Sequence, residues 1–376
     1  MMKISFVQNI RKYTMLIALV GIWLIFSILT QGVFVSPRNL SNLFLQTAAV
    51  AVITIGMTLI IVTRNIDLSV GSVAALCGAV GAFLNVKMGL PAPVALAAAV
   101  AAGLAIGAWH GFWVAYRLVP SFIVTLASMM IFRGAVLGIT GGATIAPLSA
   151  GFKGIGQNYI SPHLSLWVGI ATVSLFAVIA VLKRHKRSKF GFSVQKFPFF
   201  ALKVIAICAA MGAFFMILVE NRGIPYAVIL VMALAVAFNF MSRQMVFGRQ
   251  LYAIGGNPDA AALSGINIQK KVMMLYVIFG ALTAVGGLVM TARLNAATTS
   301  AGQGMELDVI AAAVIGGTSL MGGEGTIWGS VIGALIMASL DNGMSLMDTN
   351  ITYQYIIKGM ILLLAVWIDI ATRKKA

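Results

Sequence analysis

The chain is dominated by long apolar segments that are separated by short polar connections. Most of these segments have about the 20 residues that an α-helix needs to cross the hydrocarbon core of a bilayer. Because an unpaired peptide group is costly in lipid, such segments are expected to be helical. The pattern predicts an all-α polytopic membrane protein with about 10–12 transmembrane helices. The twelve apolar segments lie near residues 14–31, 44–63, 69–86, 91–116, 121–140, 164–182, 199–219, 224–241, 271–292, 306–321, 327–345 and 352–370.

Composition and the lengths of the connections indicate one membrane domain. Hydrophobic residues make up 60% of the chain and charged residues 9%, unlike an ordinary soluble domain. No polar stretch is long enough to bury a core of its own, so residues 1–376 are expected to form a single transmembrane domain. The first segment lacks a following small-residue cleavage site, which favours a retained helix over a removed signal peptide. Cys77 and Cys208 fall in apolar segments and are expected to be small core residues.

The distribution of basic residues predicts the orientation of the chain. If the N-terminus is cytoplasmic and every segment crosses, nineteen Lys and Arg residues lie inside and five lie outside. This asymmetry satisfies the positive-inside rule, with Arg133 and Lys358 left within segments. Both termini, the basic loop 183–198 and the polar stretch 255–268 are then cytoplasmic.

The net charge is +17, but the sequence contains no basic patch with interleaved aromatic residues. Membrane topology therefore explains the charge better than nucleic-acid binding does. The basic loop is expected to be solvated and attracted to anionic lipid headgroups. Its His185, like His110 and His163, has no suitably spaced ligand partner in the sequence, so no metal site is predicted.

A short polar island, GGNPDAAALSGINIQKKV at 255–272, predicts a complete small helix. Asn257 is a good N-cap, and Pro258 suits the first helical position. Asp259 lies in the first turn, where a negative charge meets the positive end of the helix dipole. Gly265 can take the left-handed position after the helix. At about 10 Å the helix cannot span a membrane, and its small surface, including Ala261, is expected to contact a soluble partner.

Four motifs carry a resemblance to a known family. They are NIDLSVGS at 65–72, PSFIVTLA at 120–127, GRQLYAIGGNPDAAALSGINI at 248–268 and LNAATTSAGQGMELDVIAAAVIGGTSLMGGEGTIWGSVIGALIM at 294–337. Together they resemble the permease subunits of bacterial ABC importers for monosaccharides, which include the ribose, xylose, arabinose and galactose permeases. The chain is most similar to the xylose type, and the sequence around 183–222 resembles an added helix pair that shorter ribose-type permeases lack.

The resemblance implies a division of labour between polypeptides. The chain has no G-x-x-x-x-G-K-[ST] motif, so ATP and Mg²⁺ are expected on a separate cytoplasmic ATPase. The resemblance further implies a periplasmic sugar-binding protein, a homodimer in the bacterial inner membrane, and no cofactor or enzymatic activity in this chain. It identifies the short helix as the coupling helix that contacts the ATPase, formed by Gly255, Gly256, Asn257, Pro258, Asp259, Ala261, Leu263, Ser264 and Gly265. The alternative is that this helix only connects two membrane segments.

Six charged residues lie within or at the edges of apolar segments, where ionised groups usually face the bundle interior or water. They either line the sugar route or form structural ion pairs; the second alternative is favoured for Asp341 and Lys358. Arg133 is expected to have an internal acceptor, such as a carboxylate from another helix. Neutral polar residues also suit a sugar route. The candidate route residues are Asn65, Asp67, Asn295, Gln303, Glu306, Asp308 and Asn342.

Segments 66–76 and 306–317 resemble each other weakly, since in each an aspartate precedes small residues entering a membrane segment. They would cross in opposite directions, as an inverted repeat requires. Segment 306–321 is short and contains glycines, so a short or broken helix is expected there. Glycine steps at 103, 107 and 111, and at 329 and 333, predict close helix packing.

Two classes of function remain open at this point. The first is an ATP-driven sugar permease that depends on partner subunits. The second is an ion-coupled secondary transporter whose buried carboxylates bind the ion. A membrane-embedded enzyme ranks last, because the sequence offers no nucleophile–base or metal constellation.

Overall fold

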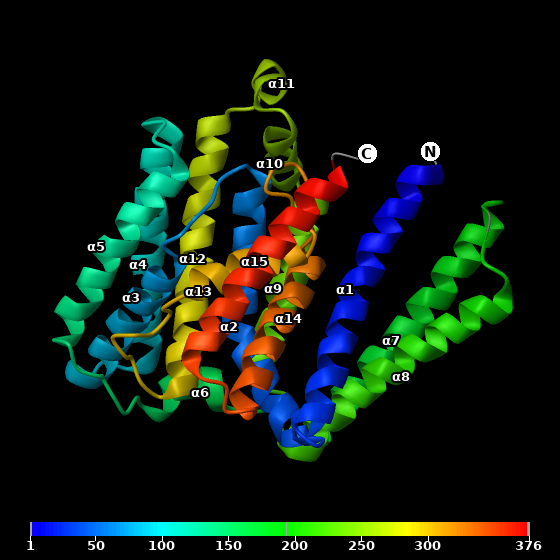
Figure 1. Ribbon diagram of the computed structural model, residues 1–376, viewed down its shortest axis with the longest axis horizontal. Helices are drawn as coiled ribbons and strands as arrows, with labels where there is room; N and C mark the ends of the chain where they lie inside the picture. The colour runs from blue at the N-terminus through cyan, green and yellow to red at the C-terminus, as the bar shows by residue number, and fades with distance from the viewer. Residues whose placement is uncertain (1, 193, 374–376) are drawn as a thin grey trace.

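The computed structural model describes residues 2–192 and 194–373, and every named element in these ranges is a helix (Figure 1). Ten of the helices are long and apolar enough to cross a membrane. They are α2 (Pro37–Val62), α3 with its π-helical extension (Val70–Lys87), α4 with its extension (Ala92–Tyr116), α5 (Ser121–Thr140), α7 (Pro162–Lys189), α8 (Phe197–Asn221), α9 (Tyr226–Gln244), α12 (Ile268–Leu294), α14 (Ile327–Leu346) and α15 (Ile351–Arg373).

The remaining elements are shorter or less apolar. Helix α1 (Met2–Leu29) has an apolar part at Met15–Leu29. The others are the 3-10 turn η1 (Val33–Val35), the π-helical extensions η2 (Phe83–Lys87) and η3 (Phe112–Tyr116), and the helices α6 (Ala150–Gln157), α10 (Val246–Gly256), α11 (Pro258–Leu263) and α13 (Met305–Ile315). The all-α polytopic fold expected from the apolar segments is therefore confirmed.

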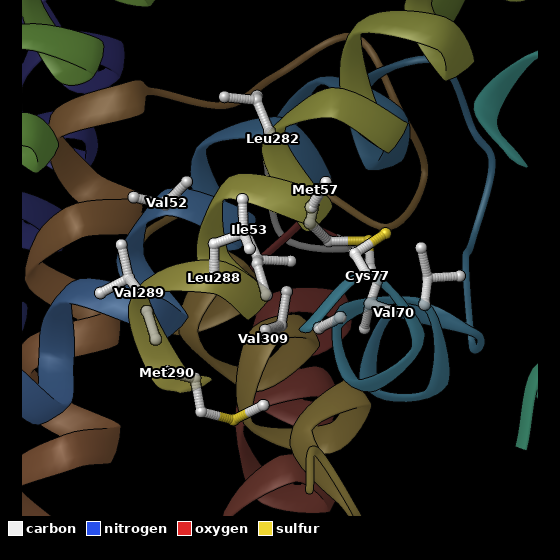
Figure 2. Close-up of a cluster of buried hydrophobic side chains, with 14 of the residues drawn as sticks. Val52, Ile53, Met57, Val70, Cys77, Leu282, Leu288, Val289, Met290 and Val309 are labelled. Carbon is white, nitrogen blue, oxygen red and sulfur yellow. The ribbon is translucent and has the colours of Figure 1, made fainter. Parts of the chain in front are cut away.

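Helix α2 lies at the centre of the bundle, and 89% of its span is buried. It packs against α12, which also packs against α3, α4 and α6. The core between these helices is built from aliphatic and methionine side chains, together with Cys77, which is fully buried. Figure 2 shows α2 contributing Val52, Ile53 and Met57 to this core and α12 contributing Leu288 and Val289. The expectation of a small core residue is confirmed for Cys77, whereas Cys208 of α8 is only partly buried and lies outside this core.

Glycines bring several backbones together, as the glycine steps predict. A Cβ atom at Gly103 in α4 would lie 2.5 Å from the carbonyl oxygen of Gly280 in α12. A Cβ atom at Gly107 would collide with the backbone of Tyr276, and one at Gly333 with that of Ala312. These positions require glycine because the neighbouring backbone occupies the space a side chain would need.

The crossing predicted at 306–321 is broken. Helix α13 has 11 residues, which is about 16 Å and roughly half of the hydrocarbon core. The non-helical segment 316–326 continues it, and there the amide of Gly323 donates to the carbonyl of Val62 at the end of α2 over 2.8 Å. Helix and segment together make the crossing, so α14 begins at the same end of the molecule as α10.

Helices α3 and α13, which belong to the two segments of the expected inverted repeat, each follow a non-helical stretch. They approach each other where Gly71, in the first turn of α3, places its backbone in direct contact with that of Gly302, just before α13. Figure 1 places both marked termini and α11 at one end of the molecule and α6 at the other. The terminal residues 374–376, including the basic Lys374 and Lys375 counted above, lie outside the described residues.

Candidate coupling site and polar cavity

Helix α11 has the local geometry that its sequence predicts. The side chain of Asn257 caps it by accepting from the amide of Ala260 at 3.0 Å, and Pro258 is its first residue. Asp259 lies in the first turn, and Gly265 takes a φ of 80° after the helix. The predicted helix and both of its ends are confirmed.

The exposure of α11 shows which of its residues a partner can touch. Leu263 is 90% exposed, an unusual position for a large apolar side chain, and Asp259 is exposed beside the N-cap. Ala261 is only 4% exposed. The expectation that Ala261 lies on the contacted surface is therefore wrong, because a six-residue helix has a single inward face and Ala261 lies on it.

Arg64 ties the base of α11 to the membrane bundle. It follows α2, and its Nε donates to the carbonyl of Gly255 at 2.7 Å while Nη2 donates to the carbonyl of Gly256 at 2.8 Å. These are carbonyls of the last turn of α10, which the helix dipole makes attractive to a cation. Two charge-assisted hydrogen bonds from one planar guanidinium fix both position and direction.

Three segments of backbone meet at the Arg64 clamp, the contact of the Arg64 guanidinium with the carbonyls of Gly255 and Gly256. A Cβ atom at Gly255 would collide with the carbonyl of Val62, and it would lie 2.6 Å from the amide of Gly323. The ends of α2, of α10 and of segment 316–326 are therefore in direct contact beneath α11. This close approach requires glycine at position 255.

Tyr252 adds a second link between α10 and segment 316–326. Its hydroxyl donates to the carbonyl of Gly325 at 2.9 Å. Burial raises the pKa of the Tyr252 phenol, so the hydroxyl keeps its proton and remains a donor at neutral pH.

A charged cluster lies toward the end of the bundle opposite α11. Lys358 of α15 contacts Asp308 of α13 at 3.0 Å and Asp341 of α14 at 2.8 Å. The preference for ion pairing of Asp341 and Lys358 is thus matched by their geometry. For Asp308 two roles remain open from the sequence, lining the sugar route or forming an ion pair. It belongs to the same cluster and is 8% exposed.

The cluster lines a cavity of about 330 Å³ between α2, α12, α13, α14 and α15. Gln46, Arg293 and Gln354 bring further polar atoms to its wall. Among the described residues, the Asp308 Oδ1, Asp341 Oδ1 and Arg293 Nε atoms are buried without a hydrogen-bond partner in the chain. Amide, carboxylate and ammonium side chains on several walls of this cavity suit a neutral, polyhydroxylated ligand.

Asn65 and Asp67 are engaged locally. Asp67 Oδ1 accepts from the amide and the hydroxyl of Ser69 at 2.8 and 2.6 Å, and the Asn65 amide donates to Thr63. His110 Nδ1 lies 3.5 Å from Asp67 Oδ2. The expectation of a solitary His110 is wrong, because α4 brings it to a carboxylate that is distant in sequence.

The other route candidates lie outside the cavity. Asn342 and Asn39 exchange amide hydrogen bonds of 2.8 and 3.1 Å, and Asn295 Oδ1 accepts from the amide of Leu148. Gln303 is exposed in a turn. A Cβ atom at Gly71 would lie 2.8 Å from Glu306 Oε2, so the Glu306 side chain, from the first turn of α13, lies against the start of α3.

Arg133 has the internal acceptors expected of it. Its Nη1 donates to the backbone carbonyls of Thr299 and Ala301 at 3.1 and 2.9 Å. The acceptors are therefore backbone carbonyls of the turn before α13, whereas the sequence analysis suggested a carboxylate from another helix.

Several site residues have no distinctive sequence pattern. Arg64 is one of the nineteen basic residues predicted to be cytoplasmic, and no motif points to Tyr252. Gln46, Arg293 and Gln354 converge on the cavity from three helices, which sequence spacing does not reveal. The position of Arg64 directly after an apolar segment is the one local feature that could have identified it.

Comparison with known proteins shows which family the chain belongs to. A family model described as branched-chain amino acid transport system / permease component matches residues 39–196 and 193–366. A xylose transport system permease protein of Haemophilus influenzae is 47% identical over 98% of this chain and 98% of its own length. The corresponding protein of Escherichia coli K12 is 44% identical over 98% and 94% of the two chains.

A ribose import permease protein of Escherichia coli K12 is 37% identical over 94% of this chain and 92% of its own. No solved structure matches the chain. The chain therefore belongs to the transport permease family that the matching model describes, together with the bacterial sugar permeases to which it is similar.

Proposed function

We propose that this chain is the membrane permease of an ATP-driven importer for xylose or a closely related monosaccharide. It would act as a homodimer that receives sugar from a periplasmic binding protein, while a separate cytoplasmic ATPase binds ATP and Mg²⁺. Similarity to xylose permeases over nearly the full length of the chain supports the substrate class.

One structural observation carries the coupling part of this proposal. The three backbones that meet beneath α11 belong to α2, α10 and segment 316–326, which joins α13 to α14. Helices α2, α13 and α14 contribute Gln46, Asp308 and Asp341 to the cavity. A displacement of α11 by the ATPase would therefore act directly on three walls of the cavity.

We propose that sugar enters through this cavity. Its volume lies near the lower end of small-molecule sites. Carboxylates, amides and the ammonium group supply acceptors and donors for sugar hydroxyls. The end opposite α11 is the periplasmic end if the positive-inside rule sets the orientation, so the cavity would open toward the sugar-binding protein.

The cluster of Asp308, Asp341 and Lys358 is also the observation that favours an ion-coupled transporter, because buried carboxylates can bind a proton or cation. Proteoliposomes separate the two functions. We expect accumulation of radiolabelled xylose only when ATP, the ATPase and the binding protein are all present. Accumulation driven by a proton or sodium gradient with this chain alone would reject the ABC permease in favour of the ion-coupled function.

A further inference from the structure

The hairpin of α7 and α8 has a role in neither the coupling site nor the cavity. Figure 1 shows it leaning away from the rest of the bundle, with its tip toward the end that carries α11 and the termini. Only 11% of the α7 span and 6% of the α8 span are buried. Most of its surface is therefore available to lipid.

A cavity of about 640 Å³ lies between the two helices near this tip. Its upper part is basic, with Lys183, Arg184 and Arg187 from α7 and Lys203 from α8. Its deeper part is apolar and includes Phe176 of α7 and Ile207 of α8. Phe176 precedes Arg184 by two helical turns, about 12 Å along the axis, so the cavity changes from basic to apolar on going into the membrane.

Arg184 is held in place at the boundary between the two parts. Its guanidinium lies 4.8 Å from the ring centroid of Phe200 and 5.8 Å from that of Phe197. Nη1 also donates to the carbonyl of Gln195 in the loop. Contact with two rings and a carbonyl orients the side chain while leaving other N–H groups able to bind an anion.

We propose that this cavity binds an anionic phospholipid of the cytoplasmic leaflet. The phosphate would lie among Arg184, Arg187 and the two lysines, and an acyl chain would cover Phe176 and Ile207. Residues 162–219 contain no Asp or Glu, and the one acidic residue of the hairpin, Glu220, lies at the end of α8 opposite this tip, so the charge around the cavity favours an anion. Basic pockets between transmembrane helices on the cytoplasmic side are suited to such headgroups.

The apolar depth of the cavity distinguishes a lipid from other anions. A free phosphate or an acidic protein segment would use the basic rim and leave the aromatic and aliphatic wall uncovered. Only a ligand with both a charged head and a hydrocarbon chain matches both parts of the lining.

The test uses the purified full-length protein in neutral detergent and native mass spectrometry with dioleoylphosphatidylglycerol. The variant Arg184→Gln/Arg187→Gln removes two lining charges. Lys186→Gln/Lys189→Gln removes the same charge from exposed positions of the same helix outside the cavity. We expect the first pair to weaken lipid binding roughly 30-fold and the control pair to weaken it by no more than a few-fold. Lys203→Gln, on the opposite wall, provides an independent variant with about a fivefold loss.

Further ligands in the same experiment identify the source of the anion. We expect dioleoylphosphatidylcholine to bind at least tenfold more weakly, and inorganic phosphate or glycerol 3-phosphate at millimolar concentration not to displace the lipid. Equal losses in the lining and control pairs would overturn the proposal by showing that general surface charge attracts the lipid. Displacement by inorganic phosphate would overturn it in favour of a simple anion site.

Discussion

Arg64 donates from Nε to the carbonyl of Gly255 over 2.7 Å, and this contact joins the end of α2 to the last turn of α10 directly beneath α11. The two residues are separated by 191 positions in sequence. Because Gly255 is also in van der Waals contact with Val62 and Gly323, the clamp has little freedom to yield. We therefore expect a movement imposed on α11 to reach the bundle at this point.

The first prediction concerns Arg64. Arg64→Gln removes hydrogen bonds from a charged donor, which weakens the anchorage by about 1–3 kcal/mol. We expect the ATPase to remain bound through α11, while xylose uptake per ATP hydrolysed decreases. Arg64→Lys should be intermediate, because an ammonium group retains the charge without the two-pronged geometry. Simultaneous measurement of uptake and hydrolysis in proteoliposomes checks this, and unchanged stoichiometry in Arg64→Gln would exclude a transmitting role for the clamp.

A second prediction tests the cavity without disturbing its charges. Gln46→Leu keeps a similar volume but removes two hydrogen-bonding groups from the wall. We expect a normal melting temperature and an uptake rate reduced about tenfold, equivalent to about 1.4 kcal/mol. Asn342→Leu is the comparison outside the cavity: it leaves the buried side-chain carbonyl of Asn39 without its donor and should lower stability by about 1–3 kcal/mol. Normal uptake by Gln46→Leu would remove the cavity from the sugar route.

The charged cluster should respond to removal of a single member. Lys358→Met leaves Asp308 and Asp341 close together without a cation, and breaking such a buried pair costs about 3–5 kcal/mol. The double variant Asp308→Asn/Lys358→Met should recover part of this loss, because only Asp341 then stays charged and the repulsion between two unpaired carboxylates is removed. Thermal unfolding in detergent measures both; additive losses would show that the residues do not interact.

Close packing of α4 on α12 gives a matched pair of glycine variants. Gly280→Ala places a methyl group against the backbone of Gly103 and should cost about 1–3 kcal/mol. Gly134→Ala in α5 meets nothing within 4 Å, so alanine should be neutral or stabilise by up to about 1 kcal/mol. Similar melting temperatures for the two variants would contradict the close approach.

The features that could be predicted from the sequence are those set by residues close together in the chain. The caps of α11 were predictable because Asn257, Pro258 and Gly265 act within one or two turns of their own backbone. The broken crossing was predictable because glycines interrupt the apolar segment at 316–317. Interactions of this kind depend on neighbours in the chain, so they appear in the sequence itself.

The inward face of Ala261 and the pairing of His110 with Asp67 were not predictable in the same way. A six-residue helix has too few turns for a hydrophobic period to show which side is buried. His110 and Asp67 meet because α4 packs beside the stretch before α3, an arrangement set by tertiary contacts. The same reason applies to the cavity, whose polar residues come from five helices.

Cysteine labelling tests the orientation. Ser188→Cys and Asp259→Cys introduce exposed thiols at the end that carries α11, whereas Gln157→Cys introduces one in α6, at the opposite end (Figure 1). We expect an impermeant maleimide added from the periplasmic side to label position 157 and to leave 188 and 259 unmodified until the membrane is permeabilised. Labelling of 259 in intact spheroplasts would invert the orientation.

The central claim is that the ATPase binds the exposed surface of α11, and Leu263→Arg tests this claim most directly. Leu263 is 90% exposed, so arginine should leave folding and membrane insertion unchanged. Ala261→Arg is unsuitable, because its side chain would have to enter a buried site. Phe190→Arg places the same charge at an exposed position on the α7–α8 tip, away from α11. We predict that Leu263→Arg abolishes co-purification of the ATPase and ATP-dependent xylose uptake while Phe190→Arg retains both; normal complex assembly and uptake in Leu263→Arg would contradict the coupling assignment.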